Sequence, residues 1–309
     1  MGRVFAETWT AEDRRELVAA QERAASAQPG DDEWKRRFDP PFIAPAEIPR
    51  DSALRKTLFE PLRVKIAKKA KAPVRFEGSL RAYRNWAFFQ GGSVDAKGKA
   101  VVDNDWFGSS DTVGLWLRTR EGWQLVAWSW GHTDAFYIHY WPNAYGAPRE
   151  LLGAENETAI EPDSPEWPEV FDPPYRKVTE ISVGSELRKK LFAVMRPAME
   201  RYVKRPVQFR GSLAGYKNWA CFEGGLVDAK GQFLEEKRLD LIYNQMAILL
   251  LRGQEGWIVV DYESGVDDDP FGFFAWPQKY GEAVWGYKTG APRPLSGGLP
   301  SSGEPGKRN

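Results

Sequence analysis

The residues best suited to catalysis in this chain form one short cluster, His132-Thr133-Asp134. A carboxylate can orient an imidazole, and histidine is the side chain that most readily exchanges a proton near neutral pH. His132 and Asp134 are therefore the candidate catalytic pair. The competing interpretation is structural, because Thr133 or Asp134 can cap a short helix that begins at Ala135. The corresponding segment later in the chain keeps an acid, Asp269, but has no histidine, which favours the capping role.

Other catalytic and metal-binding patterns are missing from the sequence. The 309 residues include one cysteine, Cys221, and two histidines, which excludes sites built from several of these ligands. The run Asp267-Asp268-Asp269 lacks the spacing of an EF-hand loop. No glycine-rich phosphate loop and no Gly-x-Ser-x-Gly nucleophile motif occurs. We therefore expect no bound metal and no cofactor, and the residue types favour a non-catalytic protein.

Tryptophan is unusually abundant, with 14 residues. Eight of them recur at matched places in the two halves of the chain, and the packing of a common core explains them. These pairs are Trp34 and Trp167, Trp86 and Trp219, Trp123 and Trp257, and Trp141 and Trp276. We expect Trp86 and Trp219 to be buried at equivalent positions, because both copies need the same core.

Tryptophans that do not recur in the other copy, and aromatic residues of the unshared insertion, are better candidates for binding a sugar, a peptide or a protein, since large aromatic side chains often anchor such ligands. Trp128 and Trp130 share one face of a strand, because side chains alternate with a period of two. The alternative for such residues is packing of one half of the chain against the other. With one histidine added, the candidate binding residues are Trp116, Trp128, Trp130, His139, Trp285 and Tyr287.

The chain contains an internal repeat with an offset of about 133 residues, far longer than a solenoid repeat. Without a gap, more than half of the positions from 52 to 99 are identical to those from 185 to 232. We interpret the chain as a tandem duplication in which each copy is a domain. The expected organisation is an N-terminal helix and linker over 1–31, repeat domains over 32–152 and 165–295, a linker over 153–164, and a flexible tail over 296–309.

Each copy is expected to contain one long helix followed by four mainly antiparallel strands. Leu54, Leu58, Leu62 and Ile66 recur every four residues, which indicates one apolar face of a helix, and Ser52 is its expected N-cap. Alternating apolar residues and glycine-containing turns then predict the strands. The expected fold class is α+β, a tandem duplication of a helix with a four-stranded antiparallel curved sheet, preceded by an extra N-terminal helix.

Several motifs give the chain a resemblance to a known kind of domain. They are Trp86-Ala87-Phe88, Gly122-Trp123-Gln124-Leu125-Val126, Thr133-Asp134-Ala135-Phe136-Tyr137 and the segment from Trp141 to Pro148. This pattern resembles an α+β domain that is widespread in uncharacterised bacterial proteins. Its order of helix and strands is similar to that of the cystatin-like or nuclear transport factor 2-like cone folds. The second copy lacks the threonine and the proline, and the resemblance implies a fold rather than a chemistry.

Charge and hydropathy limit the kinds of partner. Lys and Arg total 43, as do Asp and Glu, so no overall field favours nucleic acid or an anionic membrane. No segment approaches the ~18 apolar residues of a membrane helix, and the N-terminus has no signal-peptide pattern. We expect a cytoplasmic protein that binds a protein partner, with a small-molecule ligand as the alternative.

These patterns favour a non-catalytic binding protein of the bacterial immunity type or inhibitor type, which acts by protein–protein interaction. The alternative is a small-molecule enzyme or ligand-binding protein that uses a cone-shaped cavity near His132 and Asp134. A polar pocket that joins these residues to a buried acid would favour the enzyme. An exposed aromatic patch around Trp128, Trp130 and Trp285 would favour the binding protein.

Overall fold

The computed structural model describes residues 42–103, 108–131, 135–153, 175–236, 241–242 and 246–264, together with Trp276, Lys279 and Tyr280. The expected N-terminal helix, nearly all of the expected linker and the expected tail lie outside these residues.

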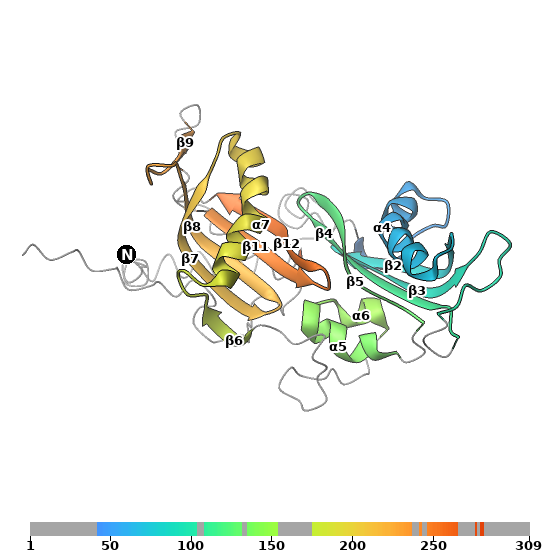
Figure 1. The fold of residues 1–309 in the computed structure, drawn as a ribbon. Helices are drawn as coiled ribbons and strands as arrows, with labels where there is room; N and C mark the ends of the chain where they lie inside the picture. The colour runs from blue at the N-terminus through green and yellow to red at the C-terminus, as the bar shows by residue number, and fades with distance from the viewer. Residues whose placement is uncertain are drawn as a thin grey trace, which may run out of the picture.

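The first half of the described chain is an antiparallel sheet with helices on both faces (Figure 1). Its strands are, in order across the sheet, β1 (Phe42–Glu47), β2 (Arg75–Arg84), β3 (Trp86–Val94), β4 (Asp111–Thr119) and β5 (Gly122–Trp130). Helix α4 (Ala53–Ala70) covers one face. Helix α5 (Phe136–Tyr145) and the short helix α6 (Arg149–Leu152) lie on the opposite face.

The second half has the same succession of elements in its sheet. The strands are β6 (Tyr175–Glu180), β7 (Gln208–Lys217), β8 (Trp219–Val227), β11 (Met246–Gly253) and β12 (Gly256–Ser264), in the order β12-β11-β8-β7-β6. Helix α7 (Glu186–Val203) lies across one face of this sheet, and β9 (Glu235–Glu236) pairs with β10 (Leu241–Ile242) in a separate ribbon. The protein is therefore α+β.

Each main sheet has five strands, so the expectation of four strands per copy is wrong. The additional strands are β1 and β6, which precede the long helices and pair antiparallel with β2 and β7. Pro45 breaks the alternating pattern of β1, and the pairing with β2 is irregular between Phe42 and Ala46. Proline is tolerated here because β1 is an edge strand that pairs on one side only.

The two long helices begin where the sequence predicts. The hydroxyls of Ser52 and Ser185 accept hydrogen bonds from the N–H groups of Arg55 and Arg188, both at 3.2 Å, which confirms the N-cap expectation for Ser52. In α4 the residues that face the sheet include Leu58, which is fully buried. The apolar helical face thus packs as its period of four indicates.

Arg55 is buried and joins three elements of the first half. Its Nη1 donates to the carbonyl of Ile48 at 3.0 Å, just after β1, and its Nη2 donates to the carbonyl of Gly78 in β2 at 2.8 Å. The guanidinium also lies 4.9 Å from the ring centre of Phe59. Arg188 makes the corresponding contacts in the second half. A buried arginine therefore fixes the long helix to the first two strands in each half.

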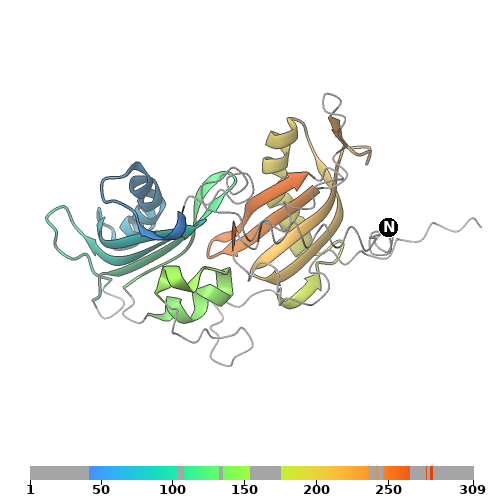
Figure 2. The ribbon, with the colours of Figure 1, turned by 180° about the vertical axis from the view of Figure 1, so that it is seen from behind.

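The buried residues form three clusters, one under each long helix and one between the halves. Under α4 the cluster includes Leu62, Phe89 and Trp116, and under α7 it includes Met195 and Phe222. The third cluster draws on both sheets and on α5 and α6. Seen from behind, α5 and α6 lie where the two halves meet (Figure 2). The inner faces of both sheets therefore share one core.

We predict that Arg55→Met lowers the free energy of unfolding by about 2–4 kcal/mol, because one buried and one partly buried carbonyl lose their donor. Arg63→Met is the matched control on the same helix, since Arg63 has a partly exposed side chain that pairs with Glu60. Its expected loss is below about 0.5 kcal/mol. Urea denaturation measures both values, and equal losses would contradict this role for Arg55.

Candidate functional site

Trp86 and Trp219 are both fully buried, as the repeat predicts. Each indole N–H donates a hydrogen bond to the other half of the chain. The Nε1 of Trp86 donates to the carbonyl of Tyr280 at 3.0 Å, and the Nε1 of Trp219 donates to the carbonyl of Tyr145 at 3.2 Å. The two halves therefore exchange the same hydrogen bond in both directions.

The residues before these tryptophans reinforce the exchange. The Nδ2 of Asn85 donates to the carbonyl of Lys279 at 3.2 Å, and the Nδ2 of Asn218 donates to the carbonyl of Ala144 at 2.9 Å. Ala144 and Tyr145 end helix α5, where carbonyls have no partner within their own helix. Side chains of the second half supply these missing donors.

The turns between the last two strands of each sheet also cross between the halves. The backbone N–H of Arg120, at the β4–β5 turn, donates to the carbonyl of Val260 at 2.8 Å. The backbone N–H of Gln254, at the β11–β12 turn, donates to the carbonyl of Val126 at 2.9 Å. Each turn thus pairs with the outermost strand of the opposite sheet, which covers part of an otherwise open edge.

Ion pairs follow the same reciprocal pattern. Glu121 in the first turn pairs with Arg201 of α7, and Glu255 in the second turn pairs with Lys65 of α4. Both glutamates are solvent-accessible, so each pair contributes only a few tenths of a kcal/mol up to ~1 kcal/mol. Their value lies in orienting each turn over the helix of the other half.

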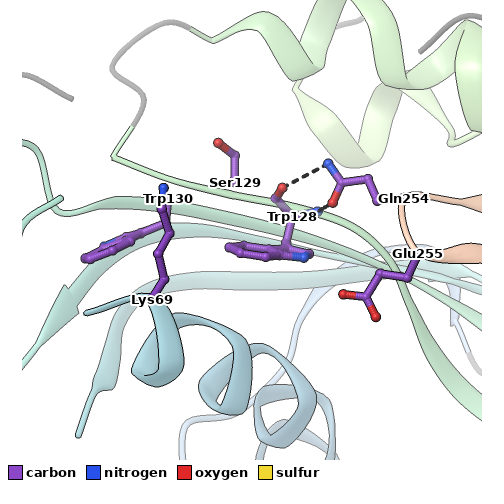
Figure 3. Close-up of a pocket in the computed structure, with 6 residues that line it drawn as sticks. All are labelled: Lys69, Trp128, Ser129, Trp130, Gln254 and Glu255. Atoms are coloured by element: carbon purple, nitrogen blue, oxygen red, sulfur yellow. Dashed lines mark hydrogen bonds between the residues drawn. The ribbon is translucent and has the colours of Figure 1, made fainter. Parts of the chain in front are cut away.

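A groove of about 320 Å³ lies where the second turn crosses the first half (Figure 3). It is lined by Lys69 of α4, by Trp128, Ser129 and Trp130 of β5, and by Gln254 and Glu255 of the β11–β12 turn. Both halves therefore contribute to the groove. The Oε1 of Gln254 accepts from the N–H of Trp128 at 2.9 Å, and its Nε2 donates to the Trp128 carbonyl at 3.1 Å.

Lys69 shapes one side of the groove. Figure 3 shows its side chain rising from α4 between the rings of Trp128 and Trp130. The ammonium nitrogen bonds the buried carboxylate of Asp103 and lies 5.4 Å from the ring centre of Trp130. Asp103 therefore neutralises the lysine charge in the groove wall.

The structure separates the candidate binding residues. Trp116 and Trp130 are buried under α4, and the Nε1 of Trp130 donates to the Ser93 hydroxyl at 2.8 Å. These two tryptophans belong to a core and do not present an exposed aromatic surface. Trp128 is half-buried and lines the groove, whereas His139 is half-buried on α5.

The remaining candidates, His132, Asp134, Trp285 and Tyr287, lie outside the described residues. Within the described ranges, no three His, Cys, Asp or Glu side chains come together in a group that could hold a metal ion. Sequence reasoning missed Lys69, Gln254 and Glu255 as groove residues.

A buried acid lies on the inner face of the second sheet. Among the described residues, the Oε1 atom of Glu223 in β8 has no hydrogen-bond partner, and burial raises the pKa of the Glu223 carboxyl to about 7. Its neighbour on the same face, Cys221, is fully buried, as expected for a structural cysteine. Burial, with the Glu223 carboxylate nearby, raises the pKa of the thiol. A protonated thiol is a poor nucleophile, which argues against covalent chemistry at Cys221.

The chain matches no protein-family model, no curated protein and no solved structure in our comparisons. The resemblance to a bacterial domain and to the cone folds therefore stays a prediction. The site has to be interpreted from its own geometry.

We predict that Glu223→Gln stabilises the protein increasingly as the pH rises. The Glu223 carboxyl has a higher pKa in the folded state than in the unfolded state, so the folded state binds its proton more tightly. The stability that the bound proton gives the wild type is lost as the pH rises through about 7. The variant should gain about 2–4 kcal/mol over the wild type at pH 8.5 relative to pH 4.5. Chemical denaturation at the two pH values measures this, with Glu77→Gln on exposed strand surface as the control. A pH-independent difference would contradict the burial of an uncompensated acid.

Proposed function

We propose that the chain is a non-catalytic binding protein that acts by protein–protein interaction through the groove beside Trp128. The groove itself is the observation that carries this proposal. It places a half-exposed indole beside polar and charged groups, and protein-binding surfaces likewise combine aromatic residues with a polar rim. Tryptophan is also the residue most often found to anchor such interfaces.

We further propose that the chain arose as a tandem duplication whose copies now act as an intramolecular pair. The repeated sequence, the matched order of elements and the reciprocal hydrogen bonds support this origin. The groove falls at a contact between the copies, where only one copy supplies Trp128 and only the other supplies Gln254. Duplication would thus have created a composite binding surface.

The specific form of the proposal is an immunity-type or inhibitor-type protein of the cytoplasm that blocks its partner by occupying it. A blocking protein needs a rigid surface and no catalytic group of its own. The crossing turns around the groove are held by backbone bonds and ion pairs from both halves. Among the described residues no helix is long and apolar enough to cross a membrane.

One observation favours the enzyme alternative. Asp103 is a buried acid, and a Cβ added to Gly131 would lie 2.5 Å from the Cβ of Asp103. Gly131 immediately precedes His132 in the sequence. An acid is therefore close to the point where the chain enters the candidate catalytic segment, as a histidine-orienting carboxylate would have to be.

We predict that Trp128→Leu abolishes binding of the natural partner without unfolding the protein. Quantitative affinity capture from the source cells compares the wild type with this variant. The wild type should recover at least one protein in an amount about tenfold higher, because the loss of an anchor residue costs ~2 kcal/mol or more of binding free energy. Trp123→Leu is the matched control, since Trp123 is half-buried on the same strand but does not line the groove. Circular dichroism checks the fold of both variants. Capture that is unchanged by Trp128→Leu would contradict the proposed function.

A further inference from the structure

The position of the groove has a counterpart in the second half, where two side chains of the chain itself contact the aromatic ring. The sheets match residue by residue at this point. Each last hairpin has an irregular register at the same place, and Trp128 and Tyr262 both stand six residues after the glycine that begins their strand. The paired positions are Trp128 and Tyr262, Gln254 and Arg120, Lys69 and Tyr202, and Glu255 and Glu121.

In the second half, a guanidinium covers the aromatic ring. The Cζ of Arg120 lies 4.4 Å from the ring centre of Tyr262, and its Nη1 donates to the Tyr262 carbonyl and lies 3.4 Å from Asp261 Oδ1. The ring of Tyr202 packs against the same tyrosine at 5.2 Å, nearly edge to face. Arginine and tyrosine side chains thus both contact the ring of Tyr262.

In the first half, neither filling side chain is present. Gln254 is shorter than arginine, and both ends of its amide are held by the backbone of Trp128, so it does not reach over the indole. Lys69 replaces the tyrosine, but its ammonium turns towards Asp103 and Trp130. The groove at Trp128 therefore lies at the position where a guanidinium and a ring contact Tyr262 in the other half.

We infer that this groove receives an arginine side chain of the partner protein, which stacks its guanidinium on Trp128 as Arg120 covers Tyr262. This inference rests on the proposed function and names the partner's chemistry. Planar guanidinium groups stack on indole better than an ammonium does, and tryptophan gives the strongest cation–π contact of the aromatic residues.

The charges around the groove are compatible with a bound cation. The wall lysine, Lys69, is already paired with Asp103, so its charge is balanced. Glu255 borders the groove with a largely exposed side chain and is paired with Lys65. An incoming guanidinium can share that carboxylate, because arginine presents several N–H donors in one plane.

The test uses the full chain labelled with 5-fluorotryptophan, in which the Trp128 signal is the one lost in Trp128→Leu. The probe is the capped peptide Gly-Arg-Gly, compared with the same peptide containing lysine or citrulline, the neutral isostere of arginine. We expect the arginine peptide to shift the Trp128 signal saturably. Binding of the citrulline peptide should be about tenfold weaker, because it keeps the shape and loses the charge.

A matched pair of variants tests occupancy. Gln254→Arg should abolish binding of the probe, since an arginine of the chain itself then covers Trp128. Gln124→Arg makes the same change at an exposed position of β5 that does not line the groove, and should keep the affinity within about threefold. The remaining tryptophan signals report whether either variant has lost its fold.

Equal binding of the citrulline and arginine peptides, or undiminished binding by Gln254→Arg, would overturn the inference. The absence of any saturable shift of the Trp128 signal would overturn it as well. None of these results contradicts the proposed function if Trp128-dependent capture of a protein from the source cells persists. Failure of the inference and failure of the proposed function are therefore distinguishable.

Discussion

The inner faces of the two sheets cannot stay in water, and burying them against each other is the constraint on which the structure depends. Trp86, Trp219 and the residues around them form one apolar cluster that belongs to both halves. Burying an indole also means finding a partner for its N–H, and in both cases that partner is a carbonyl of the opposite half. The apolar and polar requirements of the core thus lead to the same arrangement.

This shared core explains why the candidate site lies at a crossing of the halves. Once the inner faces meet, the turns at Arg120 and Gln254 are carried over the outermost strand of the opposite sheet. The two crossings use the same backbone bonds but different side chains. At one crossing Arg120 and Tyr202 contact the aromatic ring, and at the other Gln254 and Lys69 bond to other groups and the aromatic ring lines a groove. A difference between similar halves therefore marks the site better than a shared feature does.

Local patterns predicted the long helices and the Ser52 cap, because each depends on neighbours a few residues away, whereas the internal repeat predicted the burial of Trp86 and Trp219. Strand β1 escaped prediction because Pro45 breaks its alternation and only pairing with β2 defines it. The alternation of side chains along a strand correctly places Trp128 and Trp130 on one face, but this alternation does not show whether a helix covers that face. The groove escaped for a similar reason, since Lys69 and Gln254 meet only after both halves have folded and docked.

Separate expression of the two halves, residues 1–153 and 154–309, tests most directly whether the shared core is the organising constraint. Neither half alone should give a monomer with cooperative unfolding, because each would expose an apolar sheet face and leave indole N–H groups unpaired. Mixing the halves should restore a one-to-one complex with the near-ultraviolet circular dichroism of the intact chain. A separate half that stays monomeric and unfolds cooperatively would contradict the account.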